Sequence, residues 1–209
     1  MSPAKYHHGD LKNALIQAGI EILSTEGFYA LSLRKVAQRA GVSHAAPYAH
    51  FADKQALIAA ISTEGYRKLF DCIASAVARY QGEPLRQFIE AAWAYVQFAL
   101  REPAHFKLTL SGAIEKEQEY PAFVEMTRKA FQLLVDLTET CQQAGILRAG
   151  PPAQVAVSVW SLVHGFTSLI LEGQISSSLV AALSLRELLI FTLNQITIVT
   201  LDPRSVPVN

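Results

Sequence analysis

The stretch from Leu33 to Phe51 constrains this chain more than any other part of its sequence. Ser32 can cap a helix that carries apolar residues at helical spacing. Gly41 then stands where a helix would end at positive φ, which glycine adopts without steric cost. A second short helix is predicted from about His44 to Phe51. Two short helices around a glycine turn are typical of the helix-turn-helix, which places its second helix in the DNA major groove.

The residues around this stretch complete a predicted three-helix unit. A first helix over about residues 9–23 carries an apolar stripe and ends at Glu26-Gly27-Phe28. Ser43 is predicted to cap the second motif helix, Pro47 falls in or just past its first turn, and Asp53 is predicted to cap a long helix. The expected core consists of Leu15, Ile22, Phe28, Val36, Ala37, Val42 and Phe51.

Proline and glycine divide the rest of the chain into further helical segments. The predicted helices cover about residues 53–80, 84–101, 103–110, 121–144, 152–172 and 180–200, with a loop at 174–178 and a charged run at 115–119. No segment has a convincing strand pattern. The sequence therefore predicts an all-α fold of about nine helices.

The composition agrees with this fold but decides little about function. Of the 209 residues 51% are hydrophobic and 17% are charged, which a large subunit interface or an apolar pocket would explain. The net charge is zero, yet residues 1–56 carry six Lys/Arg against four Asp/Glu, and four of the six His lie there. This bias favours the N-terminal unit as the phosphate-facing part. A difference of this size also arises by chance.

The sequence lacks the usual signals of several classes of protein. There is no apolar run behind a basic start and no apolar stretch of about 18 residues, so we expect a cytoplasmic protein. Cys72 and Cys141 are expected to be reduced core thiols, with a redox sensor as the alternative. The chain shows no phosphate-binding loop and no zinc motif, and His105 lacks neighbours at ligand spacing. We therefore expect no catalytic residue, no metal and no cofactor.

Three segments, residues 18–30, 33–42 and 48–57, resemble the tetracycline-repressor (TetR) family of bacterial regulators in order and spacing. Tyr6 to Leu11, and Trp160 followed by His164-Gly165, look like one subgroup of that family. The resemblance implies a DNA-binding domain at 1–55, a helical effector-binding and dimerisation domain at 56–201, and a disordered tail at 202–209.

The resemblance also implies which residues contact DNA. An Arg at position 34 can bond guanine bidentately, and alanines near the start of the second helix suit close approach to bases. The chain departs from the common pattern at Leu33, Pro47 and Ala49, and the arm Lys5–His8 either touches DNA or frays. The implied contacts are Ser32, Arg34, His44, Ala45, Ala46, Tyr48, His50 and Lys54.

The last two predicted helices indicate a homodimer. One carries small residues on one face and the other an apolar stripe, so two copies could form a four-helix bundle. A two-fold dimer binds a near-palindromic operator. The alternative is a helical pair within a monomer. The candidate interface residues are Ser158, Ser161, Gly165, Ser168, Leu185, Leu188, Leu189, Thr192, Ile196 and Val199.

The resemblance further implies an effector cavity among the C-terminal helices. In the absence of a basic cluster we expect a small, mostly apolar molecule. Each apolar candidate is equally a core residue, and His164 bonds either a ligand or a backbone carbonyl or glutamate. The candidate lining residues are Trp93, Val96, Leu100, Phe106, Met126, Phe131, Trp160 and His164.

The function expected from these features is a ligand-responsive transcriptional regulator. A repressor released from its operator by an effector is the leading hypothesis, and activation is the variant left open. The alternative from another class is a helical protein-interaction or small-molecule-binding module without operator function. The salt dependence of DNA binding distinguishes the two.

Overall fold

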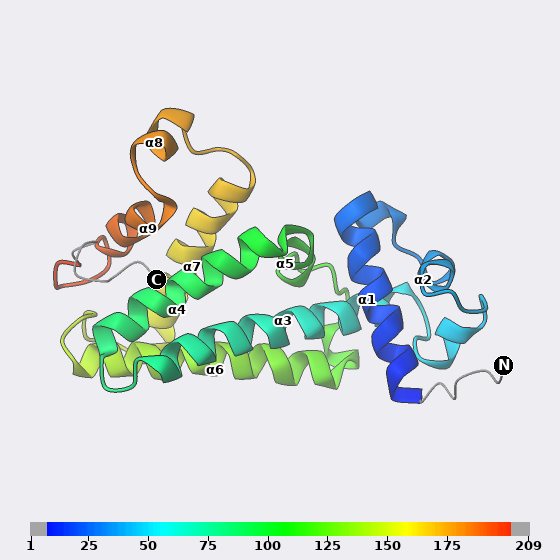
Figure 1. Cartoon of the computed structure of the whole chain (residues 1–209). Coiled ribbons are helices and arrows are strands. Elements are labelled where there is room, and N and C mark those ends of the chain that lie inside the picture. Colours follow the sequence, from blue (N-terminus) through cyan, green and yellow to red (C-terminus); the bar gives the residue numbers. More distant parts are fainter. Residues whose placement is uncertain (1–7, 202–209) are drawn as a thin grey trace. The chain divides into compact units, whose positions relative to one another are not determined.

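The computed structural model describes residues 8–201, so the Lys5–His8 arm, apart from the backbone of His8, and the tail 202–209 lie outside it. Within that range the chain is all-α, as predicted, with one isolated bridge between Leu147 and Thr197 and no strand. Figure 1 shows the helices, which are α1 (His8–Glu26), α2 (Leu33–Arg39), α3 (Lys54–Arg79), α4 (Pro84–Arg101), α5 (Pro103–Thr109), α6 (Pro121–Gln143), α7 (Pro152–Leu171), α8 (Ser177–Ala182) and α9 (Leu185–Leu193). Three short 3₁₀ helices, η1 (Phe28–Ala30), η2 (Ala46–Ala49) and η3 (Glu117–Glu119), join them.

The described chain divides into two compact units. The first contains residues 8–67 and 102–127, and the second contains 68–101 and 128–201, so α3 and α6 each contribute to both. The segment 102–127 joins the first unit because α5 packs against α1. The compact units therefore divide the chain differently from the predicted functional boundary at residues 55 and 56, which stays a prediction.

The core of the first unit forms largely as predicted. Leu15, Ile22, Val36, Ala37 and Phe51 are all buried, and Val42 packs against them from a half-buried position. They are joined by Leu57, Ile58 and Ile61 from the first turns of α3.

Phe28 is the exception in that core. Its side chain is 38% exposed, so its assignment to the core was wrong. The ammonium of Lys54 lies 4.9 Å from the centre of the Phe28 ring, a cation–π contact that gives a surface aromatic ring a partner. Phe28 therefore supports a charged side chain at the surface.

The second helix of the motif also differs from the prediction. An α-helix over about His44–Phe51 was expected, and the structure has only the 3₁₀ helix η2. The N–H of Tyr48 donates to the carbonyl of Ala45, and that of His50 to the carbonyl of Pro47, over three residues. Pro47 has no N–H with which to start an α-helical ladder. Ser43 does not cap this turn, because the cap position is Ala45 and no side chain bonds there.

The predicted last helix, over about residues 180–200, is two helices. Ser184 starts α9 with a capping box, in which its hydroxyl accepts from the N–H of Glu187 and its own N–H donates to the Glu187 carboxylate. After α9, the Asn194 side chain bonds both the N–H and the carbonyl of Leu201. These local bonds divide and end a segment whose apolar pattern alone looks continuous.

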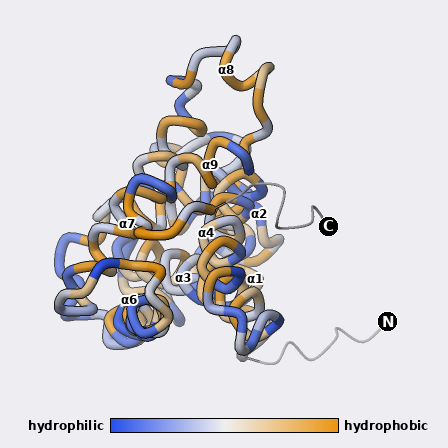
Figure 2. Tube along the Cα trace, turned by 90° about the vertical axis from the view of Figure 1, so that its left-hand side faces the viewer, coloured by the Kyte–Doolittle hydropathy of each residue, from blue (hydrophilic) through white to orange (hydrophobic). Residues whose placement is uncertain are grey.

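The second unit is built around α4, α7 and α9, which pack against one another. One face of α4 is buried. Leu189 and Leu193 of α9 are fully buried, and α9 packs against both α4 and α7. Figure 2 shows hydrophobic residues along α8, where Leu179 and Val180 are exposed.

Candidate DNA-binding surface and effector site

The first motif helix is held by its cap. The Ser32 hydroxyl accepts from the N–H of Lys35 at 3.2 Å, as the sequence predicts for an N-cap. Gly41 follows α2 with φ of 68°, the left-handed conformation expected there. Arg34, in the first turn of α2, is exposed and makes no ion pair with any residue of the described range 8–201. Its guanidinium is therefore available to a partner outside the chain.

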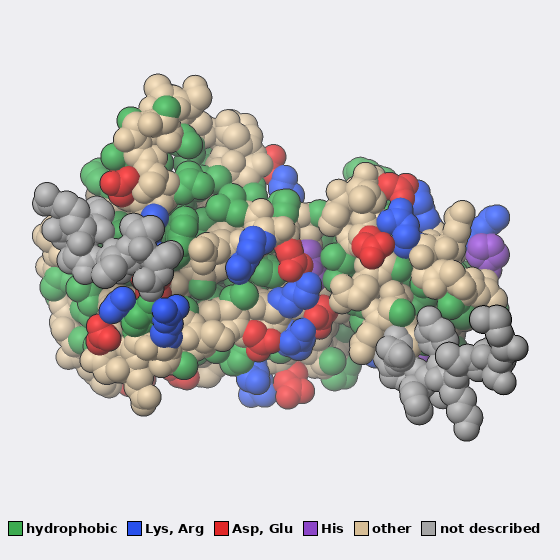
Figure 3. Space-filling view, in the orientation of Figure 1, with side chains coloured by type: hydrophobic (Ala, Val, Ile, Leu, Met, Phe, Trp, Pro, Cys, Tyr) green, Lys and Arg blue, Asp and Glu red, His purple; other side chains and the backbone are tan. Residues whose placement is uncertain are grey.

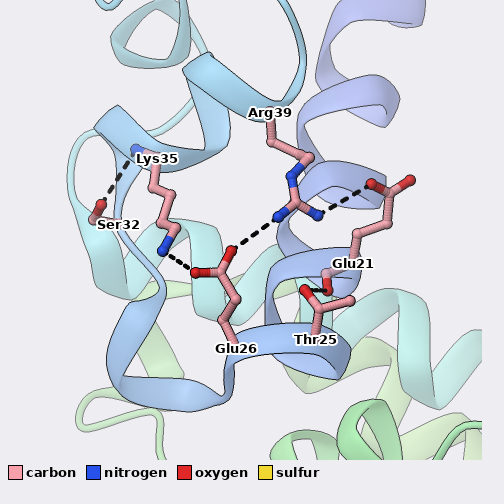
Figure 4. A network of polar contacts seen from close by, with 6 residues as sticks. All are labelled: Glu21, Thr25, Glu26, Ser32, Lys35 and Arg39. Atoms are coloured by element: carbon pink, nitrogen blue, oxygen red, sulfur yellow. Dashed lines mark hydrogen bonds and ion pairs between the residues drawn. The ribbon is translucent and has the colours of Figure 1, made fainter.

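Two other cations of α2 are used inside the unit (Figure 4). Lys35 forms an ion pair with Glu26, and Arg39 contacts Glu26 at 2.8 Å and Glu21 at 3.5 Å. Both glutamates belong to α1, so these contacts fix α2 against α1. Figure 3 shows the resulting mixture of Lys, Arg, Asp and Glu side chains over this part of the surface.

The turn that carries η2 presents most of the predicted recognition residues to solvent. His44 and Ala45 are exposed, and the side chain of Tyr48 is 62% exposed. Ala46 and His50 are half-buried, and the His50 ring lies 6.4 Å from the Phe51 ring. Pro47 is buried beneath them. The packed proline and Phe51 thus support a surface turn whose outer face carries His44, Ala45 and Tyr48.

The start of α3 adds a further positive charge to this unit. The Asp53 carboxylate accepts from the N–H of Ala56 at 2.8 Å, which confirms the predicted cap. Lys54 follows directly, with its ammonium over the Phe28 ring. A capped helix start with an adjacent lysine is suited to binding a phosphate oxygen.

In the second unit, three aromatic side chains form a hydrogen-bonded cluster that the sequence revealed only in part. The Trp160 indole N–H donates to the Tyr95 hydroxyl at 3.4 Å, and that hydroxyl lies 2.7 Å from Nδ1 of His164. The Phe131 ring lies 6.5 Å from that of Trp160. The Tyr95 hydroxyl is a partner of His164 that the sequence alternatives of a ligand, a backbone carbonyl or a glutamate did not include.

Burial sets the charge of this histidine. Desolvation lowers the pKa of His164 below its ordinary value, which favours the neutral ring. The Tyr95 hydroxyl accepts a hydrogen bond from the Trp160 indole N–H, so we assign its own O–H as the donor to Nδ1 and the proton of the neutral ring to Nε2. That nitrogen lies 3.5 Å from the Ser168 hydroxyl.

Tyr95 was missed as a site residue although its position carried a signal. It lies at helical spacing with Phe88 and Ala92, inside the buried face of α4, and a hydroxyl on such a face needs a partner. The sequence could not show that the partner is His164, 69 residues away.

The other predicted pocket residues are not brought into this cluster. Trp93 lies against Arg186, whose guanidinium is 5.6 Å from its ring, while Val96 is fully buried core and Leu100 is partly exposed. Phe106, which is buried, and Met126, which is half-buried, belong to the first unit.

The predicted interface residues differ in how far they are exposed. On α7, Ser158 and Ser161 are exposed and Gly165 and Ser168 are half-exposed. On and after α9, Leu185, Thr192 and Ile196 are half-exposed and Val199 is exposed. Leu188 and Leu189 are buried within the chain, which leaves them without a surface for a partner, so their assignment was wrong. Phe191, which was not predicted, is 66% exposed on the same helix.

A capped helix, a glycine turn and an exposed recognition turn, followed by a helical second unit, define a helix-turn-helix transcriptional regulator. Comparison with known families agrees. The model described as "Bacterial regulatory proteins, tetR family" matches residues 15–61, and "Tetracyclin repressor-like, C-terminal domain" matches residues 88–191. Together they cover more than two thirds of the chain, which belongs to the TetR family of transcriptional regulators.

Individual relatives are similar over most of their length. The uncharacterized HTH-type transcriptional regulators YobS and YvkB of Bacillus subtilis are each 26% identical, over 78% and 73% of this chain and 80% and 78% of their own. A solved structure of a protein with unknown function from Rhodococcus sp. RHA1 is 29% identical, with a TM-score of 0.76 over 92% of this chain and 96% of its own. The putative regulatory protein SCO4313, at 22% identity and a TM-score of 0.70 over 93% of this chain and 98% of its own, shares the fold.

Proposed function

We propose that the protein is a repressor that binds a near-palindromic operator as a homodimer and leaves it when a small, mostly apolar effector binds. The observation that carries the DNA-binding part is the division of the cations in the helix-turn-helix. Lys35 and Arg39 are held by glutamates of α1, whereas within residues 8–201 Arg34 makes no ion pair and Lys54 lies over the Phe28 ring. Arg34 and Lys54 are the two lysine or arginine side chains assigned to DNA.

In this proposal each DNA contact has a distinct role. Arg34 reads a base edge, and His44, Ala45 and Ala46 lie close to the bases of the major groove. Tyr48, His50, Lys54 and the Ser32 region bind phosphates and so fix the register. The second motif helix is a short 3₁₀ turn, so a few side chains at its outer face carry the base contacts.

The homodimer is proposed from the surface of α7. This is the one helix among the described residues 8–201 that is long and apolar enough to cross a membrane, yet only 28% of its apolar window is buried within the chain. Val157 and Leu169 are exposed on it, and hydrophobic side chains reach the surface around α7 and α9 (Figure 3). In a cytoplasmic regulator such a surface is suited to a second copy of the chain.

The effector proposal is centred on the cluster of Tyr95, Trp160 and His164. Aromatic faces with a few fixed polar atoms are typical of sites for small, mostly apolar molecules. We assign no catalytic role, metal or cofactor to these residues. Displacement of the operator requires that the effector prefer the state that does not bind DNA, by about 5.5 kcal/mol for a nearly complete switch.

A footprint on the DNA upstream of the protein's own gene tests the proposal. We expect a protected region with two-fold symmetry and half-sites about one helical turn or more apart. A single unsymmetrical half-site would contradict the dimer. A library of apolar compounds added to the same complex should contain members that remove the protection, and a compound that binds the protein without weakening the footprint would contradict release by that compound.

A further inference from the structure

Phe28 is an exposed aromatic residue to which the proposed function gives no role. Its side chain is 38% exposed, and the ammonium nitrogen of Lys54 lies 4.9 Å from the centre of its ring. Phe28 belongs to η1 and Lys54 is the first residue of α3, and both lie in the first compact unit. The contact therefore joins the turn that follows α1 to the start of α3.

The turn that carries Phe28 is fixed by its own backbone. Gly27 has φ of 82°, which glycine adopts without strain, and its N–H donates to the Leu23 carbonyl at 3.2 Å. The N–H of Leu31 donates to the Phe28 carbonyl at 3.2 Å, and the Leu31 side chain is buried in the core. An aromatic ring on such a turn can hold a flexible side chain in one place.

An aromatic face orients a cation without neutralising it. The ring attracts the ammonium through its quadrupole and leaves the full positive charge, whereas a carboxylate partner compensates the charge and must be displaced by a phosphate. Lys35 shows the second case, because its partner is Glu26. Within residues 8–201 Lys54 forms no ion pair, so the Phe28 ring is what orients its ammonium there.

The charge of Lys54 matters because negative charge lies at the same start of α3. Asp53 precedes Lys54 directly and caps the helix through its carboxylate. The side-chain carbonyl of Gln55 accepts from the backbone N–H of Glu115 at 3.4 Å, which places the charged run 115–119 beside α3. A carboxylate at a helix start offsets the attraction of the helix end for a phosphate. The lysine must therefore supply that attraction.

We propose that Phe28 is a positioning residue of the DNA-binding surface, whose ring holds the ammonium of Lys54 in place for a DNA phosphate without compensating its charge. A lysine that is already ordered loses less side-chain entropy when the phosphate binds, so the contact is stronger. The role rests on the proposed function, in which Lys54 binds a phosphate. It adds a residue that acts through Lys54 and touches no DNA itself.

The contact is tested first without DNA, by proton NMR of the Lys54 side chain. Protons above an aromatic face resonate upfield of their usual positions, so we expect an upfield shift of the Lys54 ε-methylene protons in the unmodified chain. Phe28→Leu keeps an apolar side chain and removes the ring, and should abolish the shift. Phe28→Tyr should retain it. Usual lysine resonances for Lys54 in the unmodified chain would overturn the proposal.

Binding is then measured on the DNA upstream of the protein's own gene and on a random duplex of equal length, at ~50 mM salt, because a phosphate contact does not depend on sequence. We expect Phe28→Leu to weaken both complexes about threefold and Phe28→Tyr to restore them. Tyr29→Leu is the matched control, since it removes a 96% exposed ring that meets the Phe28 ring edge-on. An equal loss in Tyr29→Leu and Phe28→Leu would contradict the specific role of Phe28.

A double-mutant cycle separates positioning from a general structural role. Lys54→Gln removes the charge and should lower the slope of log affinity against log salt by about 0.9. In that background Phe28→Leu should have no further effect, because the ring has no cation left to hold. A threefold loss that persists in the Lys54→Gln background would overturn the proposal.

The two duplexes distinguish this proposal from the proposed function. Equal affinity of the unmodified chain for both would count against an operator in that DNA, and the variants on the random duplex would still decide the role of Phe28. Equal binding by the unmodified chain and Phe28→Leu on both duplexes would overturn the positioning role and leave operator recognition intact. Binding to neither duplex would overturn both.

Discussion

At the scale of single residues, partners decide which side chains are available for function. Arg34, Lys35 and Arg39 lie within one short helix and have the same sign of charge, yet two of them are bound by Glu26 and Glu21 (Figure 4). A sequence pattern cannot distinguish them, because Glu26 lies 9 residues before Lys35 and 13 residues before Arg39. The same is true of His164, whose partner Tyr95 lies on another helix.

Arg34→Ala and Arg39→Ala should therefore have different effects. Loss of Arg34 should cost about 1–3 kcal/mol of operator affinity and relax specificity at one base pair, because a bidentate base contact is removed. Loss of Arg39 should lower the free energy of unfolding and leave base preference unchanged. Binding to an operator and to its single-base variants measures both. Equal loss of specificity in the two variants would contradict the assignment of Arg34.

The neutral state of His164 gives a prediction with a definite sign in pH. Its pKa is lowered by burial in the folded chain, so the unfolded chain takes up the proton more readily. This residue therefore lowers the free energy of unfolding as the pH falls through the ordinary range of histidine. We expect ¹⁵N shifts of its ring to show the Nε2–H form near pH ~6.5. A doubly protonated ring at that pH would contradict the hydrogen-bond chain from Trp160.

At the scale of helices, the sequence predicted most starts and ends and failed where a local bond or a proline intervened. The caps at Ser32 and Asp53 were predictable because each side chain accepts a hydrogen bond from a backbone N–H only three residues further along the chain. The break before α9 was missed because the apolar pattern continues across Ser184, and the short η2 turn because the effect of Pro47 was underestimated. Phe28 was placed in the core by its type, and the contact with Lys54 could not be seen in the sequence.

The caps can be tested with two serines of the same motif. Ser32→Ala should lower the free energy of unfolding by about 1 kcal/mol, because the N–H of Lys35 loses its acceptor. Ser43→Ala should have little effect, because no side chain caps η2. Chemical denaturation of both variants measures the difference. An equal loss at the two positions would show that Ser32 does not act through the cap.

At the scale of the whole molecule, the chain combines a DNA-binding unit with a helical unit that leaves apolar surface on α7 and around α9. The all-α class and the regulator family were predictable, because helical periodicity and the helix-turn-helix spacing are local properties. The compact units were not, because the placement of α5 against α1 depends on contacts between residues far apart in the chain.

The proposed dimer predicts that a charge on the small-residue face of α7 separates the subunits. Ser161→Glu places a carboxylate on that exposed face, where burial against a second copy would be costly. Sedimentation should show a dimer for the unmodified chain and a monomer for Ser161→Glu. Gln118→Glu, at an exposed position in η3, adds the same charge elsewhere and should remain dimeric. A variant at Ser161 that stays fully dimeric would place the interface on another surface.

The central claim is that the exposed turn around Tyr48 binds DNA. The most direct test measures fluorescence anisotropy on the DNA upstream of the protein's own gene, at ~50 mM and ~200 mM salt. Tyr48→Ala is compared with Tyr29→Ala, which removes a more exposed tyrosine of the same unit that is not assigned to DNA. The account predicts tight, salt-dependent binding that Tyr48→Ala weakens and Tyr29→Ala does not. Equal binding by all three proteins, or binding no tighter than to a random duplex, would contradict it.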